Sequence, residues 1–209
     1  MELQYFGANC LRVTTKHAAI VIDDNLDELG LKSITKANDI ALHTIFQPEK
    51  TSKDVKLVIN QPGEYEVSKV SIQGIAARGH MEEENQEGST IFKLIANDIR
   101  LAVVGHIHPD MKEHQLEALG PVDVLVVPVG GNGYTLDAKG ALKVIKSIEP
   151  KIVIPVHYAD KAIKYEVPQA ELTEALKEMS LEVKKEVDKL KLKHSDLPEA
   201  TETIVLKRQ

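Results

Sequence analysis

Four histidines stand at the ends of predicted strands, where side chains from distant parts of a chain can meet. Strand 99–104 runs into His106 and His108, strand 152–156 runs into His157, and His80 lies in the loop after a third strand. Neutral imidazole is a common zinc ligand, and residues i and i+2 of an extended segment point the same way. The spacing therefore predicts a metal site, whose candidate ligands are His80, His106, His108 and His157, with Asp110 and Asp160 nearby.

The same histidines also allow a purely structural interpretation. A single histidine at a strand end usually serves as a hydrogen-bonding residue. The His106–His108 spacing is also short enough to arise often by chance. On the residues alone, both interpretations stay open.

Three other features could carry chemistry, and each has a simpler structural explanation. The loop 129–134 contains three glycines ahead of a helix, which suits an anion site or, as we favour, a tight strand-to-helix connection. Cys10 lies inside a strand with only Arg12 as a nearby cation, which favours packing over nucleophilic chemistry. The alternating lysines of 189–193 are typical of a protected edge strand rather than of a nucleic-acid site.

The elements that position these residues change character halfway along the chain. The first half consists of short β-branched segments, two pairs of which are expected to form hairpins. Segment 26–35 has weak helical character, and Gln61-Pro62-Gly63 marks a turn. The strands predicted in this half are 10–15, 18–23, 39–43, 56–59, 67–77, 90–96 and 99–104.

The second half has a strand–helix–strand rhythm. The apolar runs 122–129 and 152–156 are typical of strands buried on both faces. Between them, apolar residues with a 3.6-residue period predict an amphipathic helix over 137–148, capped by Asp137. Such a βαβ unit requires parallel pairing and indicates an α/β protein with helices outside its sheets. Shorter helices are predicted around 113–119 and 172–179, and strands at 189–193 and 203–206.

Composition limits the class of protein. The 209 residues suit a single domain over 1–209, because no linker-like stretch divides them. A net charge of −6, with five Tyr, three Phe and no Trp, argues against a nucleic-acid partner. No apolar run is long enough to span a membrane, no signal peptide is evident, and a lone cysteine suits a reducing compartment. We therefore expect a cytoplasmic protein.

Several segments resemble the metallo-β-lactamase superfamily, in its branch of short zinc-dependent hydrolases. They include YFGANCL at 5–11, PGEYEV at 62–67, PVGG at 128–131 and PKIVIPVHY at 150–158. The resemblance runs nearly from end to end. It implies a metallo-β-lactamase-like αββα sandwich, in which two mixed β-sheets pack face to face with helices outside.

The resemblance also implies where metal ligands belong. The superfamily uses an H-x-H-x-D-H motif after an early strand, two later histidines and a bridging aspartate, which hold one or two zinc ions that activate a water. His80 and His157 match the later histidines, whereas His106 stands in place of the bridging aspartate. Segment 45–50 stands in place of the motif, and its residues at the four ligand positions are Ile45, Gln47, Glu49 and Lys50.

These substitutions predict that the usual dinuclear site is degenerate. Isoleucine cannot ligate a metal, and a protonated Lys50 puts a positive charge where a cation would lie. We expect no cofactor, or at most one zinc ion. We also expect a non-catalytic binding or scaffolding role, toward a small molecule or a protein partner that could be a second copy of the chain.

The alternative is a metal-dependent hydrolase with a remodelled mononuclear site. Its ligands would be His80, His106 and His157, with His108 assisting, and it would cleave an ester, amide or phosphodiester. A new role for Glu49 or Lys50 in place of the lost ligands also stays open.

Overall fold

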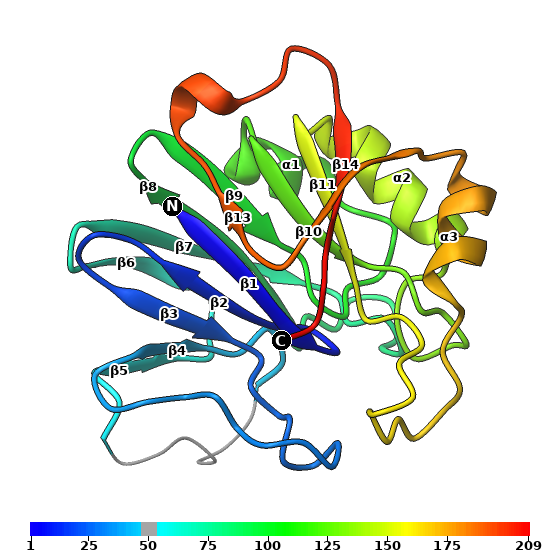
Figure 1. Ribbon diagram of the computed structural model, residues 1–209, viewed down its shortest axis with the longest axis horizontal. Coiled ribbons are helices and arrows are strands. Elements are labelled where there is room, and N and C mark those ends of the chain that lie inside the picture. Colours follow the sequence, from blue (N-terminus) through cyan, green and yellow to red (C-terminus); the bar gives the residue numbers. More distant parts are fainter. Residues whose placement is uncertain (47–53) are drawn as a thin grey trace.

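Two mixed β-sheets face each other in the computed structural model, which describes residues 1–46 and 54–209 (Figure 1). The first sheet has six strands in these ranges. Their order across the sheet is β13 (Leu190–Lys191), β1 (Glu2–Gly7), β2 (Cys10–Thr14), β3 (Ala19–Ile22), β4 (Ile40–Leu42) and β5 (Leu57–Ile59). Both hairpins expected in the first half are present, since β2 and β3 pair antiparallel, as do β8 and β9 of the second sheet.

The second sheet has eight strands. Their order is β12 (Val183–Val187), β14 (Glu202–Leu206), β11 (Ile152–Val156), β10 (Val124–Pro128), β9 (Ile99–Val103), β8 (Ser89–Ala96), β7 (Val70–Ala77) and β6 (Gly63–Val67). Strands β10 and β11 run parallel on either side of a helical crossover, as the βαβ pattern predicts. The α/β sandwich that the sequence predicts is thus confirmed.

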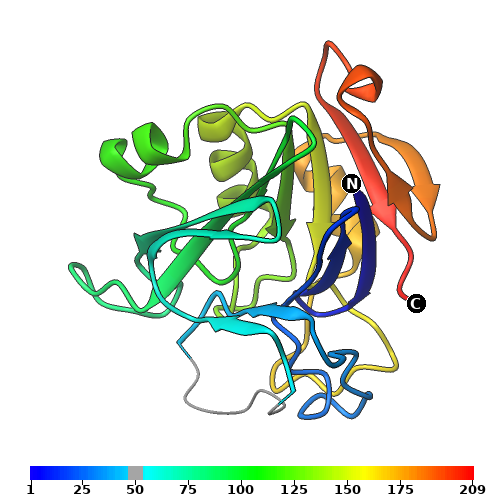
Figure 2. The same ribbon diagram turned by 90° about the vertical axis from the view of Figure 1, so that its left-hand side faces the viewer.

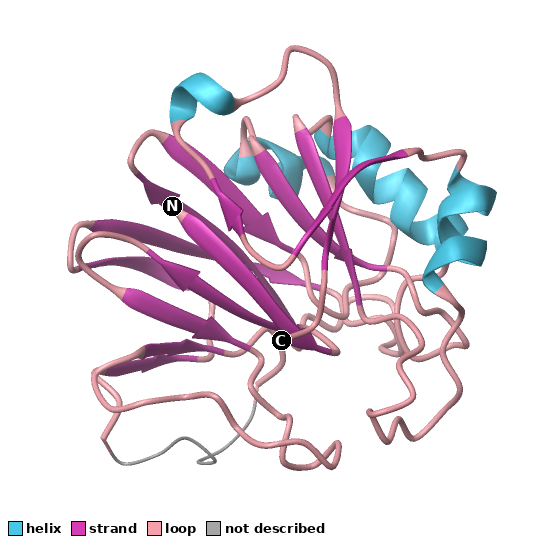
Figure 3. Cartoon of the chain, viewed as in Figure 1, coloured by secondary structure: helices cyan, strands magenta, loops and turns pink. Residues whose placement is uncertain are grey.

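Three helices lie on the outer face of the eight-stranded sheet (Figure 3). They are α1 (Glu113–Leu119), α2 (Ala138–Ile148) and α3 (Leu172–Met179), and a 3₁₀ turn, η1 (His194–Asp196), follows later. The expected cap of α2 is present, because Asp137 Oδ1 accepts a hydrogen bond from the amide of Gly140 at 2.7 Å. No helix in the described ranges is long and apolar enough to cross a membrane.

The weakly helical segment 26–35 is a loop, which corrects the sequence prediction. Asp24 Oδ2 accepts hydrogen bonds from the backbone amides of Ile34 and Thr35, and these bonds fold the segment back on itself. Side-chain bonds of this kind compete with helix formation. The apolar residues of the loop still cover the six-stranded sheet, since Leu26 packs on Cys10 and Val21 of its outer face.

Three strands, β1, β6 and β12, escape the sequence prediction. The sequence predicts one strand over 67–77 and none over 63–66, but Ser68 and Lys69 have φ values of 51° and 59° and form a tight turn between the two strands β6 and β7. Strand β12 is almost entirely exposed and so lacks the apolar alternation on which strand prediction rests. The lysine-rich strand β13 lies at the edge of the six-stranded sheet, where its charges protect the edge as expected.

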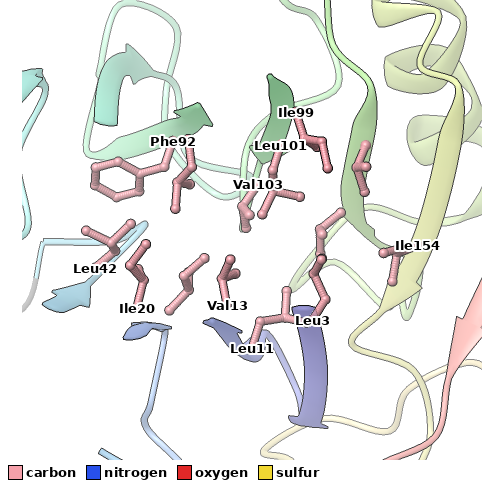
Figure 4. Close-up of a cluster of buried hydrophobic side chains, with 14 of the residues drawn as sticks. Leu3, Leu11, Val13, Ile20, Leu42, Phe92, Ile99, Leu101, Val103 and Ile154 are labelled. Carbon is pink, nitrogen blue, oxygen red and sulfur yellow. The ribbon is translucent and has the colours of Figure 1, made fainter. Parts of the chain in front are cut away.

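An aliphatic core fills the space between the sheets. Figure 4 shows side chains of both sheets meeting there, among them Leu11, Val13 and Ile20 from one sheet and Phe92 and Leu101 from the other. All five are fully buried. This core fixes the two sheets against each other and thereby fixes the loops at their ends.

Parallel strands bring several loops to one edge of the sandwich. Strands β9, β10, β11 and β14 run in one direction, as do β3, β4 and β5 in the other sheet. The loops after β3 and β11 lie at the lower side of the molecule in both Figure 1 and Figure 2. We call this the strand-end edge, and it is the place where ligand sites gather in sheets of this kind.

Candidate functional site

The two sheets meet closely at the strand-end edge through Asp23, Thr44 and Gly105. The Thr44 amide and hydroxyl donate to the two carboxylate oxygens of Asp23, at 2.7 and 2.6 Å. Gly105 has a φ of +59°, and a Cβ at this position would lie 2.2 Å from Thr44 Oγ1. Only glycine fits so close an approach. The loop after β9 therefore packs directly on the loop after β4 and brings His106 next to Ile45.

His157 provides a second link between the two sheets. It has a left-handed φ of 53°, uncommon for a residue with a side chain, and its amide donates to the carbonyl of Ala8 in the other sheet at 2.9 Å. Its ring is held by Gln169, whose Nε2 donates to the Val167 carbonyl and whose Oε1 lies 3.2 Å from His157 Nδ1. Since Gln169 Oε1 can only accept, Nδ1 carries the proton and Nε2 is left as an acceptor.

Four rings form an aromatic cluster, those of His106, His157, Tyr134 and Tyr165. The centroids of His106 and His157 are 4.8 Å apart with their planes at 84°, and Tyr134 lies edge-on to His106 at 5.0 Å. Tyr165 lies 5.0 Å from His157 on the other side. Such packing removes water from both imidazoles.

Burial keeps these imidazoles neutral near pH 7. Burial, and secondarily the neighbouring His157, lowers the pKa of His106 to about 3, and burial lowers the pKa of His157 to about 4. The pKa of His80 is lowered for the same reason. The cluster therefore presents uncharged nitrogen atoms, which can accept hydrogen bonds or ligate a metal.

Two cavities open among these residues. The inner cavity has a volume of about 50 Å³ and includes Asn9, Asp23 and His157 in its wall. The outer cavity has a volume of about 200 Å³ and includes His80 and Met81. Three residues line both cavities, namely Ile45, His106 and Tyr134.

Three of the four candidate histidines lie near one another. The amide of His80 donates to the carbonyl of His106 at 2.7 Å, and both residues line the outer cavity. His106 and His157 share the inner cavity. His108 is separate, because its Nδ1 accepts a hydrogen bond from the Asp110 amide at 3.2 Å.

The two carboxylates expected near the histidines have other partners. Asp110 forms an ion pair with Lys143, and Asp160 forms one with Arg208 at 2.6 Å. Asp110 also lies 3.7 Å from Nδ1 of the candidate His108, but neither carboxylate lines the inner or the outer cavity, and their closeness to a metal site stays a prediction. Of the substituted ligand positions, Gln47, Glu49 and Lys50 lie outside the described residues, and the expectations about them stay predictions.

The donors of the described residues do not fit a two-metal centre. Within 1–46 and 54–209, no three or more His, Cys, Asp or Glu side chains are grouped so that they could hold a metal ion. Ile45 places an apolar side chain between the cavities. The Nδ1 atoms of His80 and His106 are buried without hydrogen-bond partners, which leaves room for a smaller ligand or a single ion.

Sequence reasoning missed Asn9, Tyr134, Tyr165 and Gln169. Asn9 is only 3% exposed, and both polar atoms of its amide lack a hydrogen-bond partner. Asn9 follows Gly7 and Ala8 in the turn between β1 and β2, and an asparagine at this place predicts only a turn. Tyr134 lies in the glycine-containing loop, whose sequence indicated a connection between elements rather than a ring facing histidines.

The sequences that resemble this chain belong to one family. The Beta-lactamase superfamily domain matches residues 2–157. A UPF0173 metal-dependent hydrolase of Carboxydothermus hydrogenoformans is 51% identical over 49 residues, which cover 23% of this chain and 20% of that relative. One of Pyrococcus abyssi is 31% identical over 143 residues, which cover 65% and 62%. The chain thus matches less than two thirds of the length of these relatives.

Solved structures share the fold over the whole chain. A Thermotoga maritima protein, whose name assigns it to the Zn-dependent hydrolases of the metallo-β-lactamase superfamily, has a TM-score of 0.78 at 24% identity and covers 99% of this chain and 98% of its own. A metallo hydrolase of Ignicoccus hospitalis has a TM-score of 0.62 at 17% identity, covering 99% and 94%. With the matched domain and this architecture, the chain is a member of the metallo-β-lactamase superfamily.

Proposed function

We propose that this chain is a non-hydrolytic member of its superfamily, which binds a small molecule at the strand-end edge. One observation carries the proposal. Ile45 directly follows Thr44, which Asp23 holds by two hydrogen bonds, and its side chain lines both cavities where the superfamily pattern has its first histidine ligand. An apolar group cannot coordinate a metal but does favour an organic ligand.

The rest of the site supports binding rather than hydrolysis. His106 stands where the resemblance puts a bridging aspartate, and it is neutral near pH 7. A two-metal centre requires anionic oxygen ligands to offset the charge of the ions. The carboxylates of Asp23 and Glu82 already accept hydrogen bonds from Thr44 and from two glycine amides. Beside them the site offers neutral imidazoles, a tyrosine and an asparagine, which are groups that orient a small ligand by hydrogen bonds.

A hydrolysis assay tests this proposal. The purified chain, dialysed against zinc, should not hydrolyse p-nitrophenyl acetate or bis(p-nitrophenyl) phosphate above the rate of the His157→Ala variant. A zinc-dependent rate that His157→Ala abolishes would contradict the proposal.

A rebuilt chain provides the positive control. The five-fold variant Ile45→His, Gln47→His, Glu49→Asp, Lys50→His and His106→Asp restores the ligands of the superfamily pattern. It should gain about one or two zinc ions per chain. Failure of the rebuilt chain to bind zinc would mean that the register assumed for 45–50 is wrong.

The unpartnered Nδ1 atoms of His80 and His106 favour a second candidate, a hydrolase with one metal ion held by His80, His106 and His157. Zinc binding that requires all three residues would support it. Hydrolysis that survives exhaustive chelation, or that is unchanged in His106→Ala, would exclude it.

The setting of the protein is also part of the proposal. A cytoplasmic location suits Cys10, which is a buried free thiol. A protein partner, including a second copy of this chain, stays a proposal that size-exclusion chromatography with light scattering would test.

A further inference from the structure

The inner cavity contains a polar group that lacks a partner. Asn9 is 97% buried, since its exposed fraction is 3%, and neither Nδ2 nor Oδ1 makes a hydrogen bond to any residue of 1–46 or 54–209. An unpaired buried amide costs about 1–3 kcal/mol for each group left unsatisfied. Because Asn9 belongs to the wall of the inner cavity, a group that enters there can supply both missing bonds.

The charges around the inner cavity favour a neutral group. Among the described residues its wall contains no lysine or arginine, so these residues offer an anion no positive charge. The one carboxylate, Asp23, already accepts two hydrogen bonds from Thr44, and burial raises its pKa, which weakens its attraction for a cation. The described part of the wall therefore favours an uncharged group over an ion of either sign.

The hydrogen-bonding pattern favours a group that both donates and accepts. The side-chain amide of Asn9 has an NH₂ group that donates and a carbonyl oxygen that accepts, both in one plane. His157 adds a second acceptor, because Gln169 fixes the proton on its Nδ1 and leaves Nε2 free of one. A primary carboxamide matches this set, since its carbonyl accepts from Asn9 Nδ2 while its NH₂ group donates to two acceptors.

The outer cavity favours an apolar body beside that group. Ile45, Met81 and Tyr134 lie in its wall, and Ile45 and Met81 are 39% and 74% exposed. One carboxylate oxygen of Glu82, Oε2, accepts from the amides of Gly79 and Gly88, at 2.6 and 2.9 Å. The volume of about 200 Å³ is below the range of roughly 300–1,000 Å³ for drug-sized ligands, so a single ring or a short chain fits.

Together these features name a ligand class, and the inference rests on the proposed binding function. We infer that the site binds a small uncharged carboxamide, whose amide pairs with Asn9 in the inner cavity and whose apolar part lies against Ile45 and Tyr134.

Three matched probes test the charge preference. Benzamide, benzoate and benzylamine share one ring and differ in carrying no charge, a negative charge and a positive charge. Binding to the wild-type chain, measured by titration with protein-observed NMR, should be at least about tenfold tighter for benzamide, as expected of a site built to hydrogen-bond its ligand. No binding of benzamide, or equal or tighter binding of either charged probe, would overturn the inference.

Two variants test the role of Asn9. Asn9→Leu removes the amide at similar size and should weaken benzamide binding at least about tenfold. Thr135→Val is the matched control, because Thr135 is also fully buried with an unpartnered Oγ1 but lines neither cavity. The control should bind benzamide like the wild type, whereas unchanged binding in Asn9→Leu would refute the pairing.

The hydrolysis assay separates this inference from the proposed function. If the chain binds no metal, shows no hydrolysis and does not bind benzamide, only the inferred ligand class is refuted. A chain that hydrolyses esters with bound zinc would refute the proposed function, whatever its affinity for benzamide.

Discussion

The core between the sheets and the strand-end edge differ in the kind of side chains that they bury. The core is aliphatic, closed and built from strands that the sequence predicts, and side chains such as Phe92 and Leu101 have no exposed surface. The edge holds Asn9, His80 and His106, each with a buried polar atom that lacks a partner, and His157 in a left-handed conformation. Stability is thus concentrated in the core, and the edge retains unsatisfied groups that a ligand can satisfy.

The largest expected effect lies in the core. Phe92→Ala should lower the free energy of unfolding by about 3–5 kcal/mol, because it removes a fully buried ring from between the sheets. Urea denaturation followed by circular dichroism measures this change. A loss below about 1 kcal/mol would mean that the two sheets are held together by something other than this core.

A smaller effect should follow from acidification, and it arises at the edge. Folded His157 has a pKa of about 4, against about 6.5 in the unfolded chain, so the unfolded chain binds more protons between these values. Stability should therefore fall as the pH decreases below 6.5, and from pH 7 to pH 5 His157 alone accounts for about 2 kcal/mol.

His157→Asn provides the control for this pH dependence. Asparagine tolerates the left-handed conformation at this position and carries no group that titrates in this range. The variant should show a flatter stability curve between pH 7 and pH 5. An unchanged slope would assign the effect to other groups.

The smallest change in the free energy of unfolding should come from removing the unpaired side-chain amide of Asn9. It should be an increase, whereas Phe92→Ala causes a decrease. Asn9→Leu replaces a buried polar group without partners by an apolar one of similar size, so stability should rise by up to about 1 kcal/mol. Thermal unfolding of the ligand-free protein measures it. Destabilisation by more than about 1 kcal/mol would indicate that Asn9 has an internal partner after all.

The same contrast explains how far the sequence could predict the structure. Apolar patterning located the buried strands β10 and β11, as continuous runs, and helix α2, as a 3.6-residue period, because burial on a regular element leaves a pattern of apolar residues. It could not locate β12, whose residues are exposed, nor the loop that Asp24 folds over the six-stranded sheet. Those features depend on partners distant in sequence.

The site was predictable only in part for the same reason. Residue type and strand-end position indicated His80, His106 and His157, which the fold does bring near one another. They could not indicate that the Asp110 amide donates to His108, or that Asn9, between β1 and β2, lines the same cavity as His157. Both facts follow from how the two sheets are packed.

Zinc content per chain is the decisive measurement for the proposal that the site binds an organic ligand and not a metal. Elemental mass spectrometry on untagged protein, purified without chelators and then dialysed against zinc, should give a value near zero. The His106→Ala and His157→Ala variants should give the same value. A value near one that either variant abolishes would contradict the account and favour the mononuclear hydrolase, and a value near two would mean that 45–50 carries ligands after all.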